Sequence, residues 1–76
     1  MQQTTLEEIK RNLALNLKKA RLSKGIAQEK LAFEANVDRT VVSKIERGVT
    51  NPSLEILLRL ANNLDIKFAE LFSPNE

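Results

Sequence analysis

Apolar residues recur at intervals of three and four along most of the chain, a spacing that places side chains on one face of an α-helix. The first such stripe consists of Leu6, Ile9, Leu13, Leu17 and Ala20. Thr5 and Glu8 form a capping-box pattern at its start, and Gly25 suits a C-terminal stop. We therefore expect a first helix over residues 6 to 24, in which the poor helix formers Asn12 and Asn16 permit a break.

Two short helical patterns follow, joined by a tight turn. The first covers residues 28 to 35, with an inner face of Leu31, Ala32 and Ala35. Asn36 suits the corner because asparagine tolerates a left-handed backbone, and Val37 plugs the turn. Asp38 is a strong N-cap for the next helix, residues 39 to 47, and Gly48 ends that helix.

The C-terminal part of the chain predicts two more helices. Ser53 caps the first, whose apolar positions are Leu54, Leu57, Leu58, Ala61 and Leu64. The second lies near residues 67 to 72, and Pro74 begins a tail. With no β pattern and no repeat, the sequence predicts an all-α fold of five helices. We expect a single domain over residues 1–76, frayed at residues 1–5 and 73–76.

Composition excludes several classes of function. The 76 residues include no cysteine and no histidine, which removes the usual general base, the thiol nucleophile and the common soft metal ligands. The spacing offers no paired carboxylates or activated serine. We therefore predict that the protein is not an enzyme and uses no cofactor or metal. The N-terminus lacks a signal-peptide pattern and no apolar run reaches a membrane-spanning length, so we expect a cytoplasmic protein with no membrane partner.

The formal net charge of +2 is unevenly distributed. Through Asn51 there are ten Lys or Arg against six Asp or Glu, whereas from Pro52 onward there are two against four. The basic excess coincides with the two short helices and their turn. We expect that half to face phosphates and the other half to face a different partner.

Residues 28 to 47 have the layout of a helix-turn-helix, a unit that can place its second helix in the major groove of DNA. Val42 and Ile45 point inward on that helix, which leaves one polar face: Arg39, Thr40, Ser43, Lys44 and Arg47. Arginine can pair with guanine, threonine can meet base edges, and Val41 could touch a thymine methyl group. Taken alone, such a face is usually only solvated; the turn chemistry favours DNA.

From Leu17 onward the chain resembles the Cro/repressor-like helix-turn-helix family, also called the XRE family. The resemblance rests on Arg21, Gly25, Ile26, Gln28, Leu31, Ala32, Val37, Val42, Ser43, Ile45, Glu46, Arg47, Gly48, Pro52, Ser53, Leu54, Leu60, Ala61, Leu71 and Phe72. It implies a lambda-repressor-like DNA-binding fold. The run Asp38-Arg39-Thr40 and the short length are similar to the controller proteins of restriction-modification systems. Ala27 and Lys67 depart from the family, which has serine or threonine caps there, and Val41 departs from the controllers, which have an aromatic residue.

The resemblance also implies roles for individual residues. The base contacts are Arg39, Thr40, Ser43 and Lys44, to which the position of Val41 adds a fifth. For the phosphate contacts the resemblance implies Gln28, and the position beside the loop before the fourth helix adds Arg47, Thr50 and Asn51. An ordinary first-turn residue also explains Gln28, and plain turn chemistry also explains Thr50 and Asn51. The family pairs Arg21 with Glu46 in a partly buried salt bridge, so we assign both to structure.

One recognition helix reads only a few base pairs, whereas a two-fold dimer would read two half-sites about 34 Å apart, one with each helix. For the dimer interface we favour Ile56, Ile66, Phe68 and Phe72, although an intramolecular core explains Phe68 and Leu71 better. Leu15 and Leu22 form a second apolar line on the first helix, for which scattered surface leucines are the simpler explanation.

These features predict a regulator that binds double-stranded operator DNA, an inverted repeat, as a homodimer and that controls restriction-modification genes. A phage Cro-like repressor shares the same physics, and an antitoxin-like or other protein-interaction module uses the same fold. Activation would require contact with RNA polymerase, for which Glu29 and Glu34 are candidates, and a solvated face explains them equally well.

Overall fold

The computed structural model describes residues 3–75 as four α-helices and one short 3₁₀ helix, with no strand in that range. The α-helices are α1 (Leu6–Ser23), α2 (Gln28–Ala35), α3 (Arg39–Glu46) and α4 (Leu54–Asn63), and the 3₁₀ helix is η1 (Phe68–Phe72). The predicted all-α fold is therefore confirmed, although its fifth helix is of the 3₁₀ type. Fraying was predicted for residues 1–5 and 73–76, and of these, residues 1, 2 and 76 lie outside the described part of the chain.

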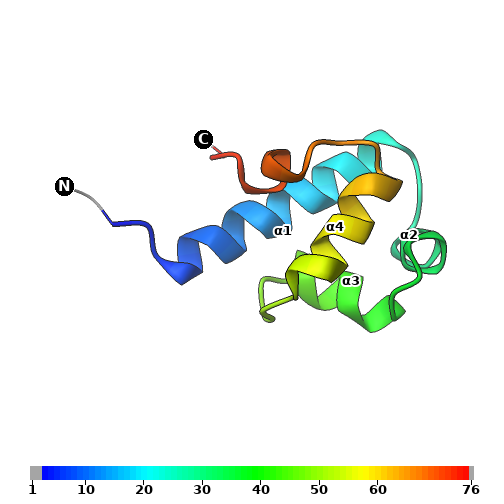
Figure 1. Ribbon diagram of the computed structural model, residues 1–76, viewed down its shortest axis with the longest axis horizontal. Coiled ribbons are helices and arrows are strands. Elements are labelled where there is room, and N and C mark those ends of the chain that lie inside the picture. Colours follow the sequence, from blue (N-terminus) through cyan, green and yellow to red (C-terminus); the bar gives the residue numbers. More distant parts are fainter. Residues whose placement is uncertain (1–2, 76) are drawn as a thin grey trace.

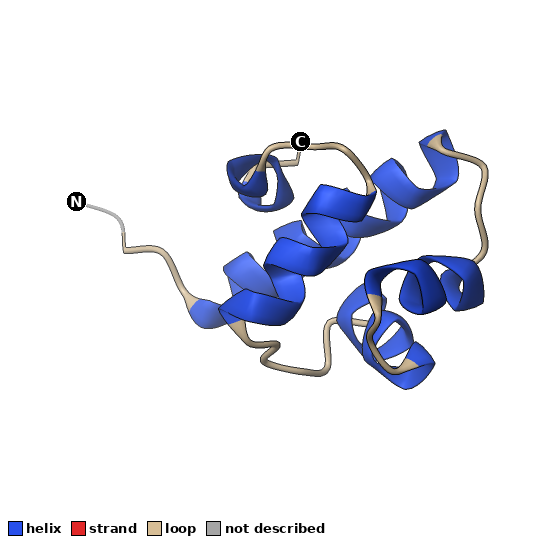
Figure 2. Ribbon diagram, turned by 45° about the vertical axis from the view of Figure 1, so that its right-hand side comes forward, coloured by secondary structure: helices blue, strands red, loops and turns tan. Residues whose placement is uncertain are grey.

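Helix α1 crosses the whole molecule and carries the other elements on its C-terminal two thirds (Figure 1). α2 and α3 lie at one end, α4 covers the middle, and η1 packs against α1 beside the C-terminus (Figures 1 and 2). The first turns of α1 project beyond the other helices. This projection makes the molecule elongated, with extents of 41 × 21 × 19 Å.

All five helices contribute to one core. Its largest fully buried side chains are Leu17, Leu31, Val42, Ile45, Leu60 and Leu71. The predicted stripe of α1 holds at Leu13 and Leu17, which are buried, whereas Leu6 and Ile9 are exposed. The first turns of α1 extend past the other helices (Figure 1), and these two apolar side chains lie outside the buried core.

The predicted apolar stripe of α4 is wrong at two positions. Leu54 and Leu58 are 73% and 48% exposed, whereas Leu60, which the prediction left out, is fully buried. The buried face is Leu57, Leu60 and Ala61, continued by Leu64 after the helix. In a leucine-rich helix two stripes satisfy the same period, and the choice between them depends on packing against α2 and η1.

Helix α1 has no break. Asn16 remains helical, and its side chain donates from Nδ2 to the backbone oxygens of Leu71, at 3.0 Å, and Ser73, at 2.8 Å. These bonds tie the end of η1 to α1. Residues with poor helix propensity are retained where tertiary contacts use their side chains.

Candidate nucleic-acid interface

The corner between α2 and α3 is a left-handed turn of the predicted kind. Asn36 has φ 57° and ψ 49°, and the Val37 N–H donates to the Ala32 oxygen at 2.9 Å. Asp38 then caps α3, since its Oδ1 accepts from the Thr40 N–H at 2.9 Å and from the Thr40 hydroxyl at 2.8 Å. These bonds define the angle at which α3 leaves the turn.

The Asp38 carboxylate is stabilised as an anion at this cap. The backbone N–H and the hydroxyl of Thr40 lower the pKa of Asp38 below its ordinary 3.8, and the nearby charges of Arg39 and Lys44 act in the same direction. The cap is therefore charged at neutral pH, and a negative charge at the N-terminus of a helix is favourable.

Helix α3 divides into a buried and an open face. Val42 and Ile45 are 0% and 1% exposed, and Val41 is half-buried against the core. Arg39, Thr40, Lys44 and Arg47 are exposed and Ser43 is half-buried. Of the five predicted base contacts, Val41 and Ser43 are therefore the two with less of the side chain free for a ligand.

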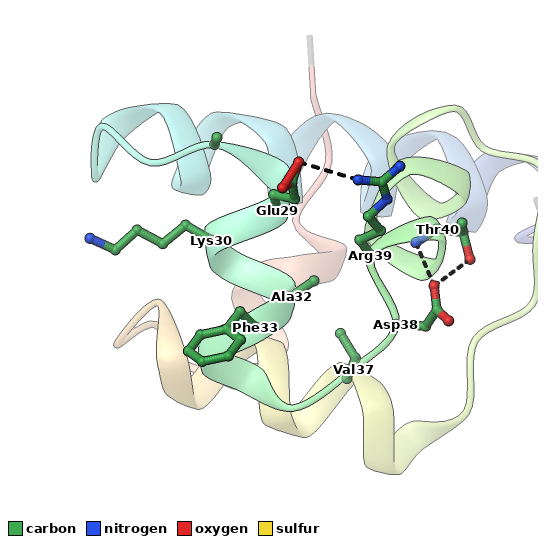
Figure 3. Close-up of a pocket in the computed structure, with 9 residues that line it drawn as sticks. Glu29, Lys30, Ala32, Phe33, Val37, Asp38, Arg39 and Thr40 are labelled. Carbon is green, nitrogen blue, oxygen red and sulfur yellow. Dashed lines mark hydrogen bonds and ion pairs between the residues drawn. The ribbon is translucent and has the colours of Figure 1, made fainter.

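Arg39 is held beside α2 by an ion pair that sequence reasoning did not identify. Its Nη1 lies 3.4 Å from Oε2 of Glu29, and the two side chains are 71% and 72% exposed (Figure 3). An ion pair this exposed contributes little free energy, so Arg39 can exchange the carboxylate for a base edge at small cost. Lys30 and Phe33 point away from α3 in the same view.

The first turn of α2 is open to a ligand. Ala27 precedes it and makes no side-chain cap, as predicted from its sequence. Backbone N–H groups at the start of a helix carry a partial positive charge and bind anions. In this protein the first turn of α2 lies beside α3 at a shallow hollow. The hollow is lined by Arg21, Ala27, Gln28, Glu29, Arg39, Thr40 and Ser43.

Arg21 and Glu46 form a buried bidentate pair that joins α1 to α3. Arg21 Nε lies 2.8 Å from Glu46 Oε2, and Nη2 lies 3.0 Å from Oε1. The remaining Nη1 donates to the Ile26 oxygen at 2.8 Å, and the two side chains are 9% and 4% exposed. The hydrogen bond to Glu46 raises the pKa of Arg21. The pair holds α3 and the loop before α2 against α1.

Gln28 joins this buried pair. Its Nε2 donates to Glu46 Oε1 at 3.0 Å, a contact that the sequence did not predict. At the other end of the helix-turn-helix, Thr50 is half-buried and Asn51 exposed, and Arg47 Nε reaches the Ser43 oxygen at 3.4 Å. The predicted phosphate contacts thus fall at both ends of the unit, Gln28 at the start of α2 and the other three after α3.

The residues predicted for self-association are all partly buried in the monomer. Ile56, Ile66, Phe68 and Phe72 pack against the core, and the rings of Phe68 and Phe72 lie 5.6 Å apart. Leu15 and Leu22 are 47% and 57% exposed. Between residues 3 and 75, no group of three or more acidic, cysteine or histidine side chains could hold a metal, and no helix is long and apolar enough to cross a membrane.

Comparison with known proteins bears on this surface. Residues 17–71 match the model of a helix-turn-helix family. The control protein C.MunI from Mycoplasma sp is 39% identical over 72 residues, which are 93% of this chain and 97% of C.MunI. Some relatives are longer: the transcriptional regulator SlrR of Bacillus subtilis is 43% identical over 68% of this chain, which spans only 35% of SlrR.

Solved structures agree with this match. The restriction-modification controller protein C.AhdI from Aeromonas hydrophila superposes with a TM-score of 0.79 at 43% identity, over 83% of this chain and 96% of that one. The controller protein C.Esp1396I, solved as a tetramer in complex with its natural 35 base-pair operator, gives a TM-score of 0.74 at 33% identity, over 92% and 88% of the two chains.

Proposed function

Because the chain belongs to this helix-turn-helix family of DNA-binding transcriptional regulators and is not an enzyme, we propose that it binds an inverted-repeat operator as a homodimer and controls restriction-modification genes. The observation that carries the proposal is the polar face of α3, which is open to solvent. The opposite face of the same helix is buried in the core and joined to α1 by the Arg21–Glu46 pair. A rigid support of this kind keeps base-reading side chains in register with the groove.

In this proposal α3 reads base edges. Arg39 leaves Glu29 to pair with a guanine, and the hydroxyls and ammonium group of its neighbours meet adjacent bases. The base contacts are Arg39, Thr40, Val41, Ser43 and Lys44. Gln28 and the open N–H groups of α2 hold one phosphate strand, and Arg47, Thr50 and Asn51 hold the strand across the groove.

The homodimer is proposed to form through α4 and η1. Ile66, Phe68 and Phe72 contribute their exposed edges, and Leu54 and Leu58 add apolar area that the core does not cover. Helical spacing places Leu54 and Leu58 on one flank of the buried face of α4, whereas Ile56 lies about 160° from each of them around the helix, on the other flank. Ile56 and the two exposed leucines therefore cannot all face one partner surface along α4.

Control of restriction-modification genes rests on the relatives. C.MunI aligns with the chain over nearly the full length of both, and C.AhdI is 43% identical. Contact with RNA polymerase, where transcription is activated, is assigned to the exposed carboxylates Glu29 and Glu34 of α2, because Arg39 releases Glu29 when it pairs with a base. The exposed Phe33 adjoins Glu34 and enlarges that surface.

The test is selection of bound sequences from a random duplex pool, followed by titration of the selected duplex at two salt concentrations. We expect an inverted repeat whose half-sites lie about one helical turn apart. Arg39→Ala should cost about 1 to 3 kcal/mol and relax the preference at one base pair. Binding that ignores sequence would contradict the proposal and leave a protein-interaction module as the function of the fold.

A further inference from the structure

A second hollow lies outside the helix-turn-helix, where the projecting part of α1 passes the end of α3. It is lined by Glu7, Lys10, Arg11, Ala14, Leu15, Arg47 and Gly48. Ala14 is buried and forms its floor, whereas Arg11 and Arg47 are exposed. Two elements that are far apart in sequence thus share one concave surface.

The charges in this hollow are mostly positive. Lys10, Arg11 and Arg47 contribute three cations, against one carboxylate from Glu7. Within residues 3–75, none of the three cations lies within ion-pair distance of a carboxylate. Unpaired cations gathered at a concave surface favour an anionic ligand, and their charge is available without breaking an internal contact.

The position of the hollow identifies the anion. Arg47, the C-cap of α3, follows Thr40 by seven positions, or about 10 Å along the helix axis at 1.5 Å per residue. A helix whose first turn meets base edges therefore brings Arg47 to the wall of a major groove about 12 Å wide. That wall is a strand of phosphates, and Lys10 and Arg11 lie beside Arg47 at this end.

We propose that Lys10 and Arg11 of α1, together with Arg47, form a phosphate-binding site for the DNA backbone at the α3–α4 side of each half-site. The inference rests on the proposed operator binding and extends the contact surface beyond the helix-turn-helix. Gln28 holds the strand on one side of the groove, and the α1 site holds the strand on the other. These contacts carry no sequence information; they add affinity and register.

The experiment compares the full-length double variant Lys10→Ala/Arg11→Ala with a control, Lys19→Ala/Lys67→Ala. The control loses the same two charges, but Lys19 faces the hollow between α1 and η1, and Lys67 precedes η1. Operator and random duplexes are titrated over a range of salt concentrations. Thermal melting and sedimentation establish that every variant has the wild-type fold and oligomeric state. A variant that does not is replaced by the same double change to glutamine, Lys10→Gln/Arg11→Gln or Lys19→Gln/Lys67→Gln.

We expect the α1 variant to bind operator and random duplex more weakly by the same factor, at least tenfold in low salt. The plot of log association constant against log salt concentration should become shallower, its slope decreasing in magnitude by about 2 per bound protomer. The reason is that each of the two lost phosphate contacts contributes roughly 0.9. The control should keep the wild-type slope within half that change. An unchanged slope for the α1 variant, or a loss confined to the operator, overturns the phosphate site. Failure of the wild-type protein itself to prefer any sequence would instead overturn the proposed operator binding.

Discussion

The side-chain amide of Gln28 donates from Nε2 to Oε1 of Glu46 at 3.0 Å, and the same carboxylate is held by Arg21. The first residue of α2 is thereby connected to the buried pair that joins α1 to α3. One amide hydrogen remains for a phosphate, along with the backbone N–H. Gln28 can therefore support the buried Arg21–Glu46 pair and contact a phosphate of the proposed DNA-binding surface at the same time.

This double role predicts two effects of Gln28→Ala. The free energy of unfolding should fall by about 1 kcal/mol, because Glu46 loses a hydrogen bond. Affinity should fall equally for operator and random duplex, because a phosphate contact reads no base. Thermal melting and duplex titration measure the two effects. Glu34→Ala, an exposed change on the same helix, is the control and should alter neither. A loss of affinity with an unchanged melting temperature would show that the hydrogen bond from Gln28 to Glu46 does not contribute to stability.

The pair of Arg21 and Glu46 should dominate the stability of the helix-turn-helix. Glu46→Gln leaves the guanidinium buried without its counter-charge, which costs about 3 kcal/mol and lowers the melting temperature by about 12 °C or more. Calorimetry or circular dichroism measures it. Glu55→Gln is the matched control: Glu55 lies 2.7 Å from Arg59 in an exposed pair, which should contribute less than about 1 kcal/mol. Equal shifts for both variants would contradict a special role of the buried pair.

Stability should fall in acid through the cap of α3. The pKa of Asp38 is lowered in the folded state, so its stabilising effect is present above the unfolded value near 3.8 and is lost as the pH falls through the folded value. Asp38→Asn caps the helix without titrating. Wild type should exceed this variant in stability at neutral pH, and the difference should disappear in strong acid. Denaturant unfolding at several pH values checks this; a difference that is constant with pH would rule out Asp38 as the titrating group.

The ion pair of Arg39 and Glu29 should compete with DNA. Glu29→Gln frees the guanidinium and removes a negative charge beside the proposed DNA-binding face of α3. We expect tighter binding, by up to about fivefold, because an exposed pair contributes at most about 1 kcal/mol. Fluorescence anisotropy on the selected operator measures the change, and Glu34→Gln at the other end of α2 is the control. Weaker binding by Glu29→Gln would indicate instead that the carboxylate orients Arg39 toward its base.

Leu58 offers a test of self-association. Leu58→Gln removes apolar area from the flank of α4 that is proposed to meet a second copy, and it should weaken dimerisation at least tenfold. Sedimentation over a range of concentrations measures the dimer. Phe33→Gln, which removes an 85% exposed aromatic side chain from α2, should leave association unchanged. The reverse pattern would move the interface to α2.

Local chemistry made much of this protein predictable. The boundaries of α2, the left-handed Asn36 and the caps at Thr5, Asp38 and Ser53 follow from interactions within a few residues, and all are present in the structure. The missing cap at Ala27 follows in the same way. Such features depend on one residue and its immediate neighbours, so no knowledge of the packed molecule is needed.

The tertiary structure decided which apolar residues lie inside and which polar residues meet. Leu60 rather than Leu58 is buried, because the packing of α4 against α2 and η1 selects one of two equivalent stripes. The bonds of Gln28 to Glu46, of Arg39 to Glu29 and of Asn16 to Ser73 join residues 18, 10 and 57 positions apart. Periodicity reports only what recurs along one helix. The distances between helices are defined only once the core has packed. The same is true of the contacts of Arg21, Glu46 and Gln28 that hold α3 with its polar face outward.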